Sequence, residues 1–443
     1  MSGFDRRDFF LLCTAAAGAM LTTTVTTGCG SSDPNAPATP GLPPGGYFDQ
    51  LASDLTAGGF GTPQILIDLD RLDANADAIA GDIGRDRYRI VEKSLPSLDL
   101  LGYVSARTGS NHFMVLHLPF LPPLLAAFPA ADVLVAKAQP INAVKRFFDT
   151  VAVNDLAATA ARVRFVVDSR PRLDELVALA GTLGVTLQVC VEIDAGLHRS
   201  GVRRPSDLPP VLAGFVANPS AVRFAGLLGY DGHILGSPAA PGIEKKAVLA
   251  AYQSVEKIFR DSVSVILTGF ASLWRDDLIF DSGGSQTYPL HHGGVVNDVA
   301  AGGGMLRPAS YNDMFIDALK PAIFIAAPVI AQFAKLELPF VNDVGQTLSD
   351  GTQSLTIYGG GWAAEFVHPN GLALAPLVND PENMNLVPNQ TLLTASSDTK
   401  ISPGDWVFQH PRVADAIFQF ENILLVRGGR LQSASWRAYP RRY

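Results

Sequence analysis

Residues 88–94 read YRIVEKS, a short and largely apolar run that ends in a lysine. Similar runs recur at intervals of roughly 20 to 50 residues, and segments with helical periodicity lie between them. This alternation is typical of parallel strands joined by crossover helices. We expect strands at residues 64–70, 87–93, 112–118, 132–138, 162–168, 186–194, 224–230 and 278–282, and helices at residues 71–81, 171–184 and 243–260.

The number of these units predicts an α/β barrel of eight strands over residues 48–310, with a doubly wound open sheet as the alternative. The barrel count works without residues 64–70, so that strand is a candidate member of a second domain. After about residue 311 short strands follow one another without helices, which predicts a β domain over residues 311–443. Its expected strands are residues 323–338, 354–358, 406–409, 416–420 and 423–427.

The composition excludes two classes of protein. Of 443 residues, 47% are apolar and 17% are charged, so a chain that is mainly disordered is excluded. The 42 acidic and 34 basic side chains give a net charge of −8, which offers no basic face for nucleic acid. Cys13, Cys29 and Cys190 are too few and too scattered for a disulfide framework or a cysteine zinc site, and Cys190 falls in an expected core strand.

The N-terminus resembles an export signal. Arg6 and Arg7 precede an uncharged stretch at residues 9–25, which resembles a twin-arginine (Tat) export signal and is too weakly hydrophobic for a membrane span. Residues 26–29, TTGC, resemble a lipobox, so Cys29 is either lipidated or lies beside a plain cleavage site. We expect a signal peptide over residues 1–29, a Pro/Gly/Ser linker over residues 30–47, and a periplasmic or membrane-anchored protein.

Candidate catalytic groups are sought at the carboxyl ends of the barrel strands, where the active sites of such barrels lie. Lys93 ends the run quoted above, and an ammonium group there is either paired, exposed at the barrel mouth or used as a Schiff base. The residue type alone leaves an ordinary lysine and a catalytic lysine open.

Two further strand ends offer polar groups. Residues 191–202, VEIDAGLHRSGV, form an acidic glycine turn in which Arg199 reaches either a ligand or an acid of its own loop. Residues 229–233, GYDGH, bring together Tyr230, a carboxylate and His233, which is either a proton shuttle or a structural histidine.

A fourth strand end carries a glycine-rich loop. Gly283 and Gly284 expose backbone N–H groups, and the polar residues Ser285, Gln286 and Thr287 follow them, as in an anion nest of the kind that late barrel loops use for phosphate. Pyridoxal 5'-phosphate requires both a lysine for its aldehyde and a nest for its phosphate. Lys93 and this loop together favour that cofactor.

The order of these features resembles the fold-type III pyridoxal-phosphate proteins, which have an alanine-racemase-like barrel, and most of all the branch of D-threonine aldolase and D-serine dehydratase. The resemblance covers residues 60 to about 430. It rests on the opening strand TPQILIDLD at residues 62–70, on Lys93, on the turn at residues 192–202, and on the Tyr-x-Gly-His pattern at residues 230–233. It implies that Lys93 forms the internal aldimine and that Arg199 and Tyr230 lie beside the cofactor.

The chain departs from the metal-dependent members of this branch, which bind a divalent ion through a His-x-Cys or His-x-Asp pair in the last strands. Arg412 and Ala414 stand at those positions here. His410 and Asp415 remain, but along one expected strand they would face opposite sides. We therefore predict no metal site, and Arg412 is a candidate for binding a substrate carboxylate.

The resemblance implies an exported enzyme that acts on a D-amino acid, with a β-hydroxy side chain, as an aldolase or ammonia-lyase, with Lys93 and His233 as catalytic residues. An amino-acid racemase and a non-catalytic cofactor-binding lipoprotein are the alternatives. The expected partners are a small amino-acid substrate and a second copy of the chain in a homodimer.

Overall fold

The computed structural model describes residues 41–235, 245–311, 314–335, 352–375 and 387–439. The expected signal peptide and most of the expected linker lie outside these residues. The linker ends before residue 47, because Pro43 is buried and Gly45 and Gly46 open helix α2 (Gly45–Ala57). Within the described ranges, no helix combines the length and the apolar character that a bilayer crossing requires.

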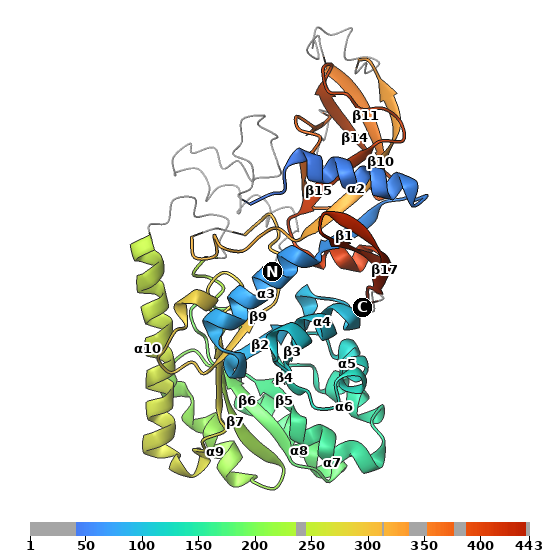
Figure 1. The fold of residues 1–443 in the computed structure, drawn as a ribbon. Coiled ribbons are helices and arrows are strands. Elements are labelled where there is room, and N and C mark those ends of the chain that lie inside the picture. Colours follow the sequence, from blue (N-terminus) through green and yellow to red (C-terminus); the bar gives the residue numbers. More distant parts are fainter. Residues whose placement is uncertain (1–40, 236–244, 312–313, 336–351, 376–386, 440–443) are drawn as a thin grey trace, which may run out of the picture.

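Eight parallel strands close into a barrel, as predicted, and the open sheet is excluded (Figure 1). The first strand pairs with both the second and the last, which closes the ring. The strands are β2 (Tyr88–Val91), β3 (His112–Val115), β4 (Asp132–Val135), β5 (Val163–Val167), β6 (Leu187–Glu192), β7 (Val222–Leu228), β8 (Ile279–Ser282) and β9 (Asp298–Ala301).

Helices cover the outside of the barrel (Figure 1). Helix α3 begins where Asp68 accepts hydrogen bonds from the amides of Asp70 and Arg71, and α4 begins at Ser97, which caps Leu100. The helices are α3 (Leu69–Ile83), α4 (Leu98–Thr108), α5 (Leu121–Ala127), α6 (Ile141–Asp149), α7 (Leu156–Arg162), α8 (Arg170–Leu183), α9 (Pro209–Ala217) and α10 (Lys245–Gly269).

The strand at residues 64–70 belongs to the second domain, as the barrel count suggested. Strand β1 (Gln64–Asp68) pairs antiparallel with β10 (Ile323–Phe333) and parallel with β16 (Asn422–Arg427). The barrel is completed instead by β9, which the sequence did not predict. This strand has only four residues, two of them alanines with low β-propensity, and its short DVAA run gives little alternation.

The C-terminal β domain lies above the barrel mouth, with α2 across it (Figure 1). The strand expected at residues 416–420 is wrong: the segment is the 3₁₀ helix η11 (Ala414–Gln419), in which Ala414, Ala416 and Ile417 are buried. The other strands are β11 (Thr352–Tyr358), β12 (Ala364–His368), β13 (Ala373–Leu374), β14 (Gln390–Ser396), β15 (Trp406–Pro411) and β17 (Arg430–Arg437).

The two domains share one apolar core. The cluster that packs the outer face of the barrel against its helices continues into β1, β10, η11 and β16 of the β domain. A separate cluster fills the barrel interior and includes Cys190, which is fully buried as predicted. The shared core fixes the β domain against the strand ends, where the candidate site lies.

Candidate active site

Lys93 lies directly after β2 in the 3₁₀ turn η2 (Glu92–Ser94), at the mouth of the barrel. Val91, the last residue of the strand, packs against the cluster inside the barrel, and Lys93 follows it in the turn at the carboxyl end. Lys93 is half-buried, and among the described residues its ammonium group has neither a hydrogen bond nor an ion pair. The alternative that Lys93 is paired with a glutamate therefore has no support within the described chain.

Two glycine loops meet beside Lys93. The first, residues 283–287, follows β8, and the second, residues 302–304, follows β9. A Cβ on Gly302 would come within 3.3 Å of the Cβ of Ser94, and a Cβ on Gly304 within 3.3 Å of the Cβ of Ser285. Only residues without side chains leave this space open. The second loop was missed, although three consecutive glycines after an apolar run were a visible signal.

The first glycine loop leaves two backbone amides without acceptors among the described residues, and its role as an anion nest stays a prediction. The amides of Gly284 and Ser285 donate to no acceptor in the described parts of the chain, and Gly283 has a φ of 89°, which favours glycine. The Ser285 hydroxyl accepts a hydrogen bond of 3.2 Å from the amide of Gly302, which ties the two loops together. The aromatic ring of Tyr230 lies against Gly284, with 3.5 Å between its Cε2 atom and a Cβ built there.

Thr287 differs from the expectation. Its hydroxyl donates to Asp231, 2.9 Å away, and its amide donates to the carbonyl of Gly284. The side chain is buried, so Thr287 anchors the loop and does not offer a free donor to a ligand. Sequence alone could not reveal this, because Asp231 lies 56 residues earlier.

The turn after β6 brings Arg199 to Tyr230. The guanidinium carbon lies 4.5 Å from the centre of the tyrosine ring, a cation–π contact, and an Arg199 nitrogen lies 3.6 Å from the Glu192 carboxylate. Arg199 thus pairs with an acid of its own turn and also faces the loop after β7, and its contact with a ligand stays a prediction. Burial raises the pKa of Glu192, and the hydrogen bond from Ser200 and the charge of Arg199 act in the opposite direction.

His233 lies against the same turn. Its ring would be 2.7 Å from a Cβ on Gly196, whose φ is 123°. Its Nδ1 atom is buried and has no hydrogen-bond partner among the described residues. Gly232 is required between Tyr230 and His233, because a Cβ there would collide with the tyrosine ring. The sequence order thus brings Arg199, Tyr230 and His233 together over β6 and β7.

Two basic side chains that the sequence reading missed lie at the ends of β3 and β4. The strands pair Val115 with Val135, and His117 and Lys137 follow two residues later, each within electrostatic reach of the other. Partial burial, then the charge of Lys137 and then that of Lys93, lower the pKa of His117. The mouth over β2 to β4 is therefore basic.

Glu92 is a second group that the sequence reading missed. Its carboxyl group is fully buried, and neither oxygen has a hydrogen-bond partner in the described part of the chain. Burial and then the negative charge of Asp415 raise the pKa of Glu92 from its ordinary value of 4.5 to about 8. The hydroxyl of Tyr439, also buried without a described partner, lies within the electrostatic reach of Glu92. A neutral carboxyl group is therefore held between the barrel and the β domain.

The residues considered as metal ligands do not gather. His410 is fully buried, its Nε2 atom lies 2.9 Å from the carbonyl oxygen of Arg307, and burial lowers its pKa to about 4. The argument that His410 and Asp415 face opposite sides of one strand is wrong, because β15 ends at Pro411 and Asp415 lies in η11. Arg412 pairs with Glu365 at 3.3 Å. Over the described ranges, no three His, Cys, Asp or Glu side chains form a group that could hold a metal. The absence of a metal stays a prediction.

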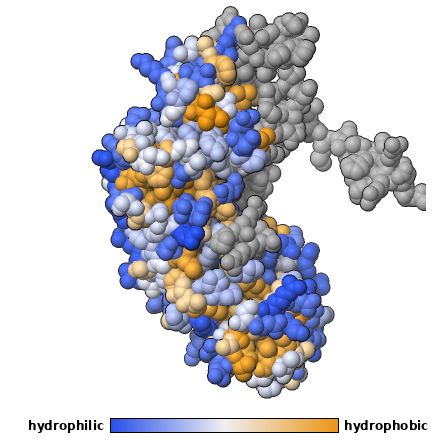
Figure 2. Space-filling view, turned by 90° about the vertical axis from the view of Figure 1, so that its right-hand side faces the viewer, coloured by the Kyte–Doolittle hydropathy of each residue, from blue (hydrophilic) through white to orange (hydrophobic). Residues whose placement is uncertain are grey.

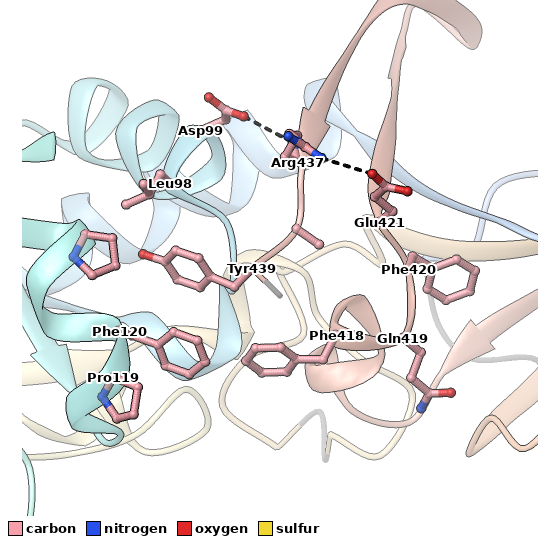
Figure 3. Close-up of a pocket in the computed structure, with 12 residues that line it drawn as sticks. Leu98, Asp99, Pro119, Phe120, Phe418, Gln419, Phe420, Glu421, Arg437 and Tyr439 are labelled. Carbon is pink, nitrogen blue, oxygen red and sulfur yellow. Dashed lines mark hydrogen bonds and ion pairs between the residues drawn. The ribbon is translucent and has the colours of Figure 1, made fainter. Parts of the chain in front are cut away.

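A cavity of about 790 Å³ lies at the junction of the two domains, away from the glycine loops. It opens on the side that carries α5 and β17, a surface where hydrophobic patches interrupt hydrophilic ones (Figure 2). Phe120 stacks between Phe418 and Tyr439 along it, and Arg437 bonds to Asp99 and Glu421 at its edge (Figure 3). None of the candidate site residues lines this cavity.

Comparison with known proteins agrees with this geometry. Residues 67–265 match the model of the alanine racemase N-terminal domain. The D-threonine aldolase of Filomicrobium marinum has 18% identity and a TM-score of 0.67, and the match covers 91% of this chain and 98% of that one. The D-threo-3-hydroxyaspartate dehydratase of Delftia sp. HT23 has 18% identity, a TM-score of 0.65, and coverage of 86% and 98%.

Alanine racemase of Clostridium difficile 630, in complex with cycloserine, shares the fold with 14% identity, a TM-score of 0.62 and coverage of 85% and 98%. None of the curated protein sequences matches the chain. The fold is thus that of alanine racemase, whose fold-type III family depends on pyridoxal phosphate, acts on small amino acids and is often dimeric.

Proposed function

We propose that the chain is a pyridoxal-phosphate enzyme that acts on a D-amino acid with a β-hydroxy side chain, as an aldolase or an ammonia-lyase. The observation that carries the proposal is Lys93, which lies at the barrel mouth beside two side-chain-free loops and has no ion pair in the described structure. Two proteins of the same fold act on D-threonine and D-threo-3-hydroxyaspartate, both of which are β-hydroxy amino acids.

The residues present fit this cofactor. Lys93 would hold its aldehyde carbon through the ε-amino group, and the amides of Gly284 and Ser285 would receive the phosphate. Tyr230 and Arg199 would lie beside the ring, where their own stacking contact already fixes both side chains. When bound, the cofactor supplies an electron sink that weakens the bonds to the α-carbon of an amino acid.

This chain's own residues would then decide which bond breaks. The amino group of Lys93 would be positioned to move a proton at the α-carbon on one face. His233 and Tyr230 come from the turns on the other side of the mouth and are the candidates to take the β-hydroxyl proton or to assist its departure. Loss of the hydroxyl proton with cleavage of the Cα–Cβ bond gives an aldehyde and glycine. Loss of the α-proton and the hydroxyl together releases water, and uptake of water then gives a keto acid and ammonia.

The first test is covalent capture. Purified protein mixed with pyridoxal phosphate should turn yellow, and borohydride reduction should fix the cofactor on Lys93, as read by peptide mass spectrometry. Lys137→Ala is the matched control, since Lys137 also follows a barrel strand at the mouth and should leave the capture unchanged. Lys93→Ala should abolish it. Capture that survives Lys93→Ala would contradict the assignment, and a wild-type protein that takes up no cofactor would end the proposal.

The second test identifies the reaction. The loaded protein is incubated with D-threonine, D-serine and D-3-hydroxyaspartate, and aldehyde, ammonia and chirality are assayed. Aldehyde indicates an aldolase, ammonia a lyase, and a change of chirality alone a racemase. No product from any D- or L-amino acid would favour the non-catalytic protein, and activity lost to a chelator would contradict the predicted absence of a metal.

We also propose that the protein is exported through the Tat pathway and anchored at Cys29, on the strength of the Arg6-Arg7 pair and the TTGC motif. Replacing both arginines by lysine should keep the folded protein in the cytoplasm, as read by cell fractionation. Cys29→Ser should release it from the membrane fraction. If both variants are distributed like the wild type, the proposed export and anchoring are refuted. A homodimer is expected on size-exclusion chromatography with light scattering.

A further inference from the structure

Asp231 joins the loops that follow β7 and β8. Its side chain is fully buried, and its two carboxylate oxygens accept from two different residues of the second of these loops. The Thr287 hydroxyl donates to Oδ1 at 2.9 Å, and Nε2 of His291 lies 2.9 Å from Oδ2. His291 is also fully buried, and the distance between the two atoms is that of a hydrogen bond. Asp231 is therefore an internal anchor and not a surface charge.

The bonds that Asp231 receives determine the shape of the first glycine loop. The amides of Thr287 and Tyr288 both donate to the carbonyl of Gly284, so the chain turns tightly behind Gly284 and Ser285. With Thr287 held at Asp231, the turn is closed on its buried side. The amides of Gly284 and Ser285 remain without acceptors in the described chain.

Side chains of α10 pack against His291, one of the two residues that bond to Asp231. Tyr252 of α10 packs edge-on against the His291 ring, with 5.1 Å between ring centres, and its hydroxyl donates to Glu256 at 3.2 Å. Glu256 in turn accepts a hydrogen bond from the amide of Val295. Because His291 is held on this side, its imidazole cannot turn away from Asp231 without breaking buried packing.

Asp231 also follows Tyr230 in the chain. The Tyr230 ring lies against Gly284, so the same carboxylate fixes the glycine loop and the backbone of the residue that lies over it. A buried carboxylate close to an anion site would repel the anion unless its charge is offset. The donors from Thr287 and His291 supply that offset.

We propose that Asp231, through Thr287 and His291, is a positioning residue for the phosphate of the cofactor and sets the preference of the site for phosphorylated over unphosphorylated pyridoxal. This inference rests on the proposed function. None of the three side chains need touch the cofactor, because the anchor acts by holding the amides of Gly284 and Ser285 in place. Removing one of the hydrogen bonds to Asp231 should weaken binding of the phosphate and leave the bond to Lys93 unchanged.

The test compares Thr287→Val, which keeps the shape and removes the hydroxyl, with Thr287→Ser, which keeps the hydroxyl. Dissociation constants for pyridoxal phosphate and for pyridoxal are measured on the whole protein by absorbance titration, and the phosphorus NMR shift of the bound phosphate is recorded. We expect Thr287→Val to weaken the phosphorylated ligand about tenfold or more and pyridoxal less than about twofold. Thr287→Ser should match the wild type.

His291→Gln is the second variant, because a glutamine amide can donate to Asp231 and should retain most of the preference for the phosphorylated ligand. If Thr287→Val leaves the ratio of the two constants unchanged, or weakens both ligands equally, the inference is overturned while the proposed function stands. A wild-type protein that binds neither ligand would overturn the proposed function and this inference with it.

Discussion

Replacing Glu92 by glutamine should make the protein more tolerant of alkaline pH. Glu92 is fully buried, and its pKa is raised from 4.5 to about 8 by burial and by Asp415. In the unfolded chain the carboxyl group loses its proton above pH 4.5, whereas the folded protein holds the proton until about pH 8. The free energy of unfolding therefore falls as the pH rises between these values, and above pH 8 the loss is complete.

The magnitude follows from the two pKa values. Each pH unit between them costs about 1.4 kcal/mol, so Glu92 lowers the free energy of unfolding by about 3 kcal/mol at pH 7 and by about 5 kcal/mol above pH 8. Because the side chain is fully buried, solvent screening does not reduce this figure much. Glutamine has the same shape and no charge to lose, so Glu92→Gln removes this pH dependence.

Urea unfolding of the wild type and Glu92→Gln near pH 5 and near pH 8.5 checks the reasoning. The wild type should lose about 4 kcal/mol more than the variant between the two conditions. Glu421→Gln is the control, because Glu421 is exposed and paired with Arg437, and it should follow the wild type. Parallel pH profiles for wild type and Glu92→Gln would refute a buried neutral carboxyl group at this position.

Three further predictions concern stability. Gly232→Ala should destabilise the protein by about 1 to 3 kcal/mol, because the new Cβ collides with the ring of Tyr230. Gly269→Ala is the control, because a Cβ there meets nothing within 4 Å and should leave the stability unchanged or raise it. Urea unfolding compares the two variants. Asp298→Ala should cost about 3 to 5 kcal/mol, since it leaves the buried Arg89 guanidinium without its bidentate partner, and the thermal midpoint should fall accordingly. His410→Asn should remove a loss of stability at acid pH, because burial lowers the pKa of His410 to about 4 whereas the unfolded chain takes up the proton below pH 6.5. Between neutral pH and about pH 5, the unfolding free energy of the wild type should therefore fall by about 2 kcal/mol more than that of the variant, as measured by urea unfolding.

The sequence predicted those parts of the molecule that depend on local pattern. Strand and helix alternation predicted the barrel, with an open sheet as the alternative, and it marked the strand end at which Lys93 lies. The residue type left the role of Lys93 open, and only the family resemblance favoured a catalytic lysine. The strand β9 escaped because its four residues carry too little alternation, and the segment at residues 416–420 was read as a strand because its apolar run is equally suited to a buried 3₁₀ turn.

The parts of the site that were missed or misread depend on neighbours that are distant along the chain. Thr287 looked like a ligand donor because its hydroxyl follows two glycines, but its partner Asp231 is 56 residues away. Glu92 was not singled out, because nothing near it in the sequence shows that it is buried within the electrostatic reach of Asp415 and Tyr439 of the β domain. Residue type gives the chemistry that is available, and only the packing decides whether it faces a ligand or another residue.

The charged side chains at the two ends of the barrel differ in whether they are paired. At the N-terminal ends of the strands, Arg89 bridges Asp298 and Asp132, and Asp132 also pairs with Arg164, so every one of these buried charges has a partner. At the C-terminal ends, Lys93 has no such partner in the described chain. A buried paired network stabilises one arrangement of the strands, whereas an unpaired ammonium group at the mouth is available for chemistry. Substitutions at the first end should therefore lower the free energy of unfolding without altering ligand preference, whereas replacing Lys93 itself should abolish covalent capture of the cofactor without lowering that free energy.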